Sequence, residues 1–122
     1  MFFYDNVNEL GVKKLHIEPT NRCNSRCPHC PRTNSVSIKN SGIKELTLDL
    51  IKKINISRLT HVFMCGNYGD PMLCDEIYDI CDYFKGYDLN IDTNGSIRSS
   101  DWWGKLGKLF ANTNSRVTFA LD

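Results

Sequence analysis

Residues 60–92 read T-H-V-F-M-C-G-N-Y-G-D-P-M-L-C-D-E-I-Y-D-I-C-D-Y-F-K-G-Y-D-L-N-I-D, and this stretch predicts the fold. Its first part, residues 60–66, is β-branched and apolar without alternation, which is typical of a strand covered on both faces. A second predicted strand, Leu89–Asp92, closes the stretch. Between the two, five apolar residues recur at the spacing of one helix face: Leu73, Ile77, Ile80, Cys81 and Phe84. The stretch is therefore a β-α-β unit, whose strands we expect to be parallel.

Upstream of this unit the sequence predicts another strand, a long loop and a helix. Residues 14–18, K-L-H-I-E, alternate in polarity and precede a proline, which indicates a short strand. Residues 20–43 are polar and contain three cysteines, and a loop of this length inside a compact domain is usually functional or disordered. Residues 45–54 predict a short helix capped by Thr47. Its apolar face is expected to consist of Leu50, Ile51 and Ile54.

Downstream, Ser100 or Asp101 is expected to cap a third helix, and residues 116–121 predict a fourth strand. The resulting order is β, loop, α, β, α, β, α, β, which indicates an α/β fold with a parallel sheet. Open doubly wound sheets and (β/α) barrels both begin in this way, and both place ligands at the C-terminal ends of the strands. A final parallel strand would leave an apolar edge unpaired, so we expect the sequence to be a fragment.

Composition narrows the class of protein. The 122 residues are 41% hydrophobic and 24% charged, as in a soluble globular domain. The 15 basic and 14 acidic residues are interspersed, which argues against a nucleic-acid or membrane partner. The N-terminus lacks the basic and apolar regions of a secretory signal, and no stretch approaches the roughly 18 apolar residues of a membrane span. We therefore expect a cytoplasmic protein.

The six cysteines are too few for a disulfide framework, because secreted disulfide-rich chains typically have about twice this share of cysteine. Three of them lie within eight residues, in the order Cys23-Asn-Ser-Arg-Cys27-Pro-His-Cys30. A loop this tight can wrap one corner of a cubane iron–sulfur cluster, for which thiolates are the usual ligands. Three ligands leave one iron open for a substrate or cofactor, as an open position does in catalytic zinc sites. Positive charge that lowers thiol pKa flanks the loop at Arg22, Arg26 and Arg32.

Two other interpretations of the cysteine loop are a structural zinc site and an inert loop. Zinc would need a fourth ligand, for which His29, Cys65 or His16 are candidates, and it usually binds paired C-x-x-C knuckles. The chain would then be a non-catalytic zinc-binding module. A truncated chain that binds iron without activity is a further alternative. Cys81 is expected to be a small buried core residue, and His16 a structural histidine.

The context E-P-T-N-R-C-N-S-R-C-P-H-C, residues 18–30, resembles the defining motif of the radical S-adenosylmethionine (radical SAM) superfamily. The E-P-T-N segment and the following Pro31-Arg32 resemble most its peptide-modifying and sulfatase-maturing branches, which often carry a C-terminal SPASM domain. The resemblance implies that residues 1–122 are the N-terminal portion of a radical SAM core domain. The fold would then be a partial (β/α) TIM-like barrel, truncated after about the fourth strand. Later strands and any auxiliary-cluster domain would be missing.

The resemblance also implies a mechanism. In that family the open iron of a 4Fe-4S cluster chelates S-adenosylmethionine, and the reduced cluster passes it one electron. The resulting 5′-deoxyadenosyl radical abstracts hydrogen from a substrate, here a peptide, a protein side chain or a small molecule. A reducing donor such as flavodoxin or ferredoxin would supply the electron. Because the later strands are missing, the fragment alone is not expected to complete a substrate site.

Further motifs follow the predicted strands. Gly66-Asn-Tyr-Gly69-Asp70-Pro71 resembles the family's G-G-E-P segment, whose backbone binds the cofactor's amino group, with Tyr68 replacing a glycine and Asp70 replacing glutamate. Thr93-Asn94-Gly95 resembles its T-N-G turn, and read alone both segments are ordinary turns. The resemblance implies three metal ligands, Cys23, Cys27 and Cys30. It also implies a set of cofactor-binding residues: His29, Tyr68, Gly69, Asp70, Pro71, Thr93, Asn94 and Asp122.

Overall fold

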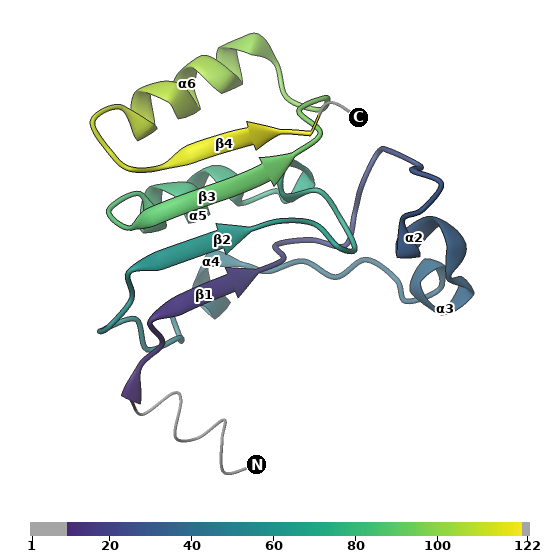
Figure 1. Ribbon diagram of the computed structural model, residues 1–122, viewed down its shortest axis with the longest axis horizontal. Coiled ribbons are helices and arrows are strands. Elements are labelled where there is room, and N and C mark those ends of the chain that lie inside the picture. Colours follow the sequence, from purple (N-terminus) through teal and green to yellow (C-terminus); the bar gives the residue numbers. More distant parts are fainter. Residues whose placement is uncertain (1–9, 121–122) are drawn as a thin grey trace.

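The structure is a computed structural model in which residues 10–120 are described. Its centre is a four-stranded parallel sheet in the order β1-β2-β3-β4 (Figure 1). The strands are β1 Lys14–Ile17, β2 His61–Met64, β3 Asp88–Thr93 and β4 Arg116–Phe119. The predicted α/β class, the parallel pairing and all four strands are confirmed.

Short helices connect the strands. They are α2 Pro31–Asn34, α3 Val36–Lys39, α4 Leu48–Ile51, the 3₁₀ helix η1 Pro71–Leu73, α5 Ile77–Phe84 and α6 Ser100–Phe110. In Figure 1, α4 and α5 lie behind the sheet, whereas α2 and α3 lie beyond the C-terminal ends of the strands. In a doubly wound sheet the strand order reverses at one point. Within residues 10–120 it does not reverse. Each connection therefore adds its strand at the same edge of the sheet.

The hydrophobic core lies between one face of the sheet and these helices. Val62, Met64, Leu89 and Ile91 point into it and are fully buried. From the helices it receives Ile51, Ile77, Ile80, Cys81, Phe84 and Leu106. Each of these helix residues is at most 1% exposed, so the predicted apolar face of α5 is confirmed for its four helical members.

The opposite face of the sheet is not covered by helices in the described part of the chain. One row across it consists of His16, Phe63, Asn90 and Arg116, which are paired in register. The expectation that the strand in residues 60–66, which is β2, is covered on both faces was therefore wrong. His61 is exposed and Phe63 is half-buried, because the crossovers place the helices on one side only.

Three local expectations also needed correction. The loop 20–43 contains two helical turns, α2 and α3, and α2 begins at a proline, which suits the first helical position. The helix α4 has a single turn after its Thr47 cap, so Leu50 stays 48% exposed and does not join the core. The cap of α6 is Ser99, whose hydroxyl accepts a hydrogen bond from Trp102 N at 3.2 Å. Among residues 10–120, no helix is long and apolar enough to cross a bilayer.

Candidate cluster and cofactor site

The three predicted metal ligands lie on the loop between β1 and α2. Cys23 and Cys30 are half-buried and Cys27 is exposed. Cys30 is the N-cap residue of α2, and its N–H donates to Cys27 O at 3.1 Å. All three thiols are free, and within residues 10–120 no three Cys, His, Asp or Glu side chains converge in a metal-binding arrangement. The ligand set therefore stays a prediction from the sequence.

The loop after β2 packs directly against the base of the cysteine loop. Gly69 is buried there, and a Cβ added to it would lie 2.2 Å from Thr20 O and 2.8 Å from Arg22 N. Only glycine fits such an approach, since real Cβ atoms essentially never come this close to backbone. The next residue ties the two loops together, because Asp70 N donates to Arg22 O at 2.7 Å.

The side chain of Asp70 is a buried carboxylate, 5% exposed. It caps η1 by accepting from Met72 N at 2.9 Å. It also reaches the end of β3, where it accepts from Thr93 Oγ1 and from Asn94 N, both at 2.7 Å. The last two hydrogen bonds join the loop after β2 to the end of β3 and to the turn that follows it. Its oxygens thus already have protein partners, and so has the Thr93 hydroxyl.

The turn after β3 holds the cysteine loop from the other side. Gly95 adopts φ +73°, and its N–H donates to Thr93 Oγ1 at 3.1 Å, which closes the turn. Asn94 Nδ2 donates to Asn24 Oδ1 and to Ser25 Oγ at 3.0 Å, and it lies 3.8 Å from Cys23 Sγ. Sequence reasoning placed Asn94 at the site but missed Asn24 and Ser25. The only signal for them was their position next to Cys23.

The arginines around the loop do not act alike. Arg22 turns away from the thiols and binds Glu45 Oε1 at 2.6 Å and Asp75 Oδ1 at 3.0 Å, and these hydrogen bonds raise its guanidinium pKa. Arg32 instead donates to Cys23 O at 2.8 Å and to Ser25 O at 3.2 Å. It therefore supports the loop backbone. A groove of about 810 Å³ lies alongside, lined among others by Arg22, Cys23, Arg26 and Arg32.

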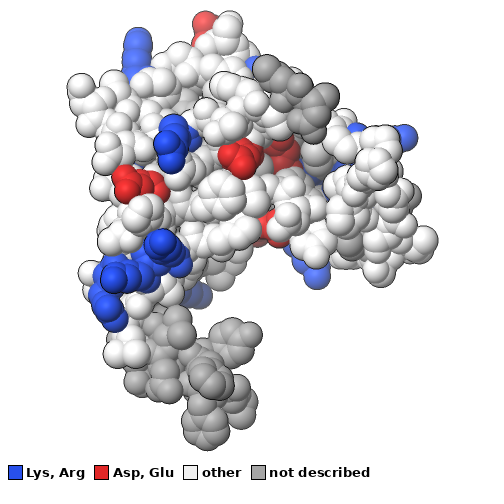
Figure 2. Space-filling view, in the orientation of Figure 1, with Lys and Arg blue, Asp and Glu red and all other residues white. Residues whose placement is uncertain are grey.

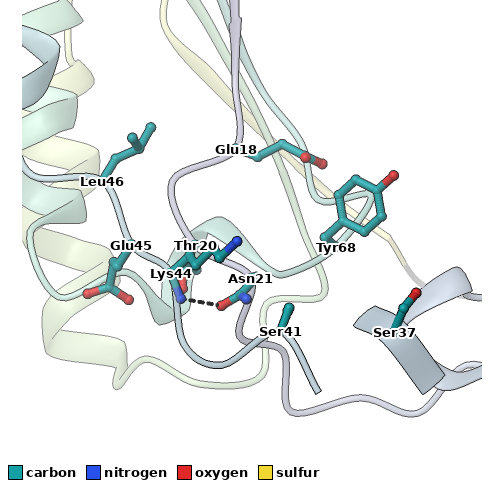
Figure 3. Close-up of a pocket in the computed structure, with 9 residues that line it drawn as sticks. All are labelled: Glu18, Thr20, Asn21, Ser37, Ser41, Lys44, Glu45, Leu46 and Tyr68. Atoms are coloured by element: carbon teal, nitrogen blue, oxygen red, sulfur yellow. Dashed lines mark hydrogen bonds between the residues drawn. The ribbon is translucent and has the colours of Figure 1, made fainter. Parts of the chain in front are cut away.

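Tyr68 lies apart from these contacts. It is 43% exposed and lines a second pocket of about 350 Å³, between the end of β1 and the segment that leads to α4 (Figure 3). In Figure 3, Glu18 reaches toward the tyrosine ring, and Lys44 N donates to Asn21 Oδ1 at 2.9 Å. His29 is exposed at the tip of the cysteine loop. Asp122 lies outside the described residues.

On the uncovered face, His16 and Cys65 form a pair that the sequence did not predict, with His16 Nε2 3.1 Å from Cys65 Sγ. Figure 2 looks onto this face and shows both acidic and basic side chains on it. Burial raises the pKa of the Cys65 thiol, and the carboxylates of Glu18 and Asp92 raise it further. His16 and Cys65 are 49 residues apart in the sequence, and only the pairing of β1 with β2 brings them together.

The two remaining cysteines belong to the core. Cys74 and Cys81 are fully buried, as expected for Cys81. Burial raises the pKa of Cys74 to about 11 and that of Cys81 to about 12, so both stay protonated near neutral pH. Protonated buried thiols are poor metal ligands, because the thiolate is the ligand.

No family model matches the chain, and neither a curated protein nor a solved structure is found to be similar to it.

Proposed function

We propose that this chain is the N-terminal portion of a radical SAM core domain. It would bind a 4Fe-4S cluster through Cys23, Cys27 and Cys30 and S-adenosylmethionine at the iron that these cysteines leave open. One observation carries the proposal: three motif segments that lie far apart in the sequence touch one another beyond the C-terminal ends of consecutive parallel strands. Gly69 packs on Thr20 and Arg22, and Asn94 contacts the residues around Cys23. Ligand sites of parallel α/β folds gather at this end.

The donor set fits a cluster of this kind. Three free thiols on one loop match the thiolate ligands of cubane clusters, and the number three leaves one iron without a protein ligand. Cys23 Sγ is approached by two N–H donors, Ser25 N at 3.4 Å and Asn94 Nδ2 at 3.8 Å. Such donors stabilise negative charge on sulfur and are one of the factors that set cluster potentials.

When bound, the cluster and S-adenosylmethionine supply a carbon-centred radical that removes a hydrogen atom from a substrate. The chain's own residues bind and orient these groups. Arg32 holds the carbonyls of Cys23 and Ser25, and the buried Asp70 fixes the turn that carries Asn94. Of the predicted cofactor-binding residues after β2, Gly69 packs on the base of the cysteine loop, where its backbone groups can meet the cofactor. Pro71 follows as the first residue of η1, and Tyr68 faces the second pocket.

The consecutive strand order and the uncovered sheet face favour a partial (β/α) barrel, because a barrel keeps its crossover helices outside and its opposite face inside. The uncovered row of His16, Phe63, Asn90 and Arg116 would then face the barrel interior. We further propose a cytoplasmic protein that receives electrons from a donor such as flavodoxin or ferredoxin. Its substrate would be a peptide, a protein side chain or a small molecule.

The test is anaerobic reconstitution with iron and sulfide, followed by electron paramagnetic resonance of the dithionite-reduced protein with and without S-adenosylmethionine. The control is a variant with Cys23→Ala, Cys27→Ala and Cys30→Ala. We expect a cubane signal that changes when S-adenosylmethionine is added and that is absent from the variant. Stoichiometric zinc without a cluster in the folded protein would overturn the proposal and favour a zinc-binding module.

A further inference from the structure

We infer that Asp70 and Asn94 form a latch that fixes the Cys23 end of the cysteine loop in place before any cluster binds, and that Asn94 is a positioning residue for Cys23. The latch runs from the loop after β2, through the turn after β3, to the cysteine loop. Its existence does not depend on the proposed function, whereas its effect on a bound cluster rests on it.

The first half of the latch is the Asp70 carboxylate. Because it is 5% exposed and accepts three hydrogen bonds, it has no freedom to reorient without leaving buried donors unpaired. Through Asn94 N, at 2.7 Å, it determines where the backbone of the β3 turn lies. The aspartate side chain is long enough to reach from the loop after β2 to the turn after β3 at this buried position. A glutamate carries one more methylene, which a closely packed site accommodates only by moving its neighbours.

The second half is the Asn94 side chain, whose orientation follows from its partners. Oδ1 accepts from Ser96 N at 3.0 Å and from Ser96 Oγ at 2.8 Å. The amide nitrogen must therefore face the cysteine loop, where its two hydrogens meet acceptors on Asn24, Ser25 and Cys23. A second contact strengthens this arrangement, because Asn24 Nδ2 donates to Ser96 Oγ at 2.7 Å.

The latch acts on one end of the loop. Residues 23–25 are held by Asn94 and Arg32, whereas Cys27 and His29 are exposed. We therefore expect Cys23 to be placed in advance, while the exposed Cys27 moves toward it when a metal group binds. Because only one end of the loop is held, the three thiols need not converge before a metal group binds, and within the described residues they do not.

The test compares Asn94→Asp with Asn90→Asp. Both changes are nearly isosteric and add one negative charge. Asn94→Asp keeps the acceptor for Ser96 but removes the amide donor, whereas Asn90 bonds Arg116 on the uncovered face and does not touch the loop. Amide hydrogen exchange of the metal-free protein is followed by mass spectrometry for residues 21–26, with α5, Ile77–Phe84, as an internal reference.

We expect Asn94→Asp to speed exchange in residues 21–26 by about threefold to tenfold, the effect of a net loss of about one hydrogen bond, and to leave α5 unchanged. Asn90→Asp should match the wild type in both segments. Unchanged exchange of residues 21–26 in Asn94→Asp would overturn the latch.

The positioning role is read from the reconstituted proteins. A lost N–H donor to Cys23 should make the cluster's midpoint potential more negative and shift its paramagnetic resonance spectrum in Asn94→Asp but not in Asn90→Asp. If exchange rises yet both spectra and potentials agree, Asn94 orders the loop without positioning Cys23, and that part of the inference fails. If no protein binds a cluster, including the wild type, the proposed function fails, and the exchange data alone decide the latch.

Discussion

Replacing Gly69 by alanine is expected to separate the cysteine loop from the loop after β2. The added Cβ would lie 2.2 Å from Thr20 O, 2.7 Å from Asn21 C and 2.8 Å from Arg22 N. All three are backbone atoms, which cannot swing aside as a side chain can. Because ordinary contacts between carbon atoms are about 3.5–4.0 Å long, the two loops must move apart by roughly 1 Å or more.

The magnitude follows from two contributions. Inserting a methyl group into a closely packed site costs about 1–3 kcal/mol. Separation also strains or breaks the hydrogen bond from Asp70 N to Arg22 O, which contributes about 0.5–1.5 kcal/mol. We therefore expect Gly69→Ala to lower the free energy of unfolding by about 2–4 kcal/mol. Since the cysteine loop is displaced, iron bound after reconstitution should fall as well.

The assay is urea unfolding followed by circular dichroism and tryptophan fluorescence, together with iron and sulfide analysis. The control is Gly107→Ala within α6, where an added Cβ meets no atom within 4 Å. An alanine in a helix interior is favoured over glycine by about 0.5–1 kcal/mol, so the control should be slightly more stable than the wild type. If Gly69→Ala unfolds at the wild-type urea concentration and binds iron equally well, the close approach of the two loops is refuted.

Asp70→Asn should lower the free energy of unfolding by about 1–3 kcal/mol, because an amide group then faces buried N–H donors; equal urea midpoints for variant and wild type would contradict this. The folded-state pKa of Cys81 is raised to about 12, so its stabilisation is complete below pH 9 and is lost as the pH rises toward 12. Between pH 9 and 11 we expect the free energy of unfolding, measured in urea titrations, to fall by about 2–3 kcal/mol more for the wild type than for Cys81→Ala. Parallel pH profiles of the two proteins would disprove the raised pKa of Cys81. Glu45→Gln should cost about 1 kcal/mol by weakening the ion pair in which Glu45 Oε1 accepts from both Nε and Nη2 of Arg22, measured by thermal unfolding at low and high salt.

Periodicity in the sequence was enough to place the four strands and the main helices. Ile77, Ile80, Cys81 and Phe84 repeat at helical spacing and are all buried, because local backbone geometry dictates which side chains share a face. The local errors concern helix ends, such as the Ser99 cap of α6, whereas the error about the sheet arises because burial depends on distant segments. The run around Phe63 reads like a strand covered on both faces, yet that ring is half-buried because no helix packs over it within residues 10–120.

The sequence alone determined the candidate chemistry. Three cysteines at spacings suited to one cluster corner need no tertiary information, since all three lie on one short loop. The glycine, aspartate and proline of Gly66–Pro71 and the turn at Thr93–Gly95 were also recognisable as segments that follow strands.

Only the tertiary structure decided what these residues touch. Arg22 looks like a charge beside the thiols, but its guanidinium binds Glu45 and Asp75, which lie 23 and 53 residues away. Asp70 looks like a cofactor ligand, but its carboxylate is held by the end of β3. Such partners are set by strand order and register, which bring distant backbone segments within hydrogen-bonding distance. A linear pattern of residue types therefore identifies the groups that meet at the site, while the sheet determines which of them remain free to bind a ligand.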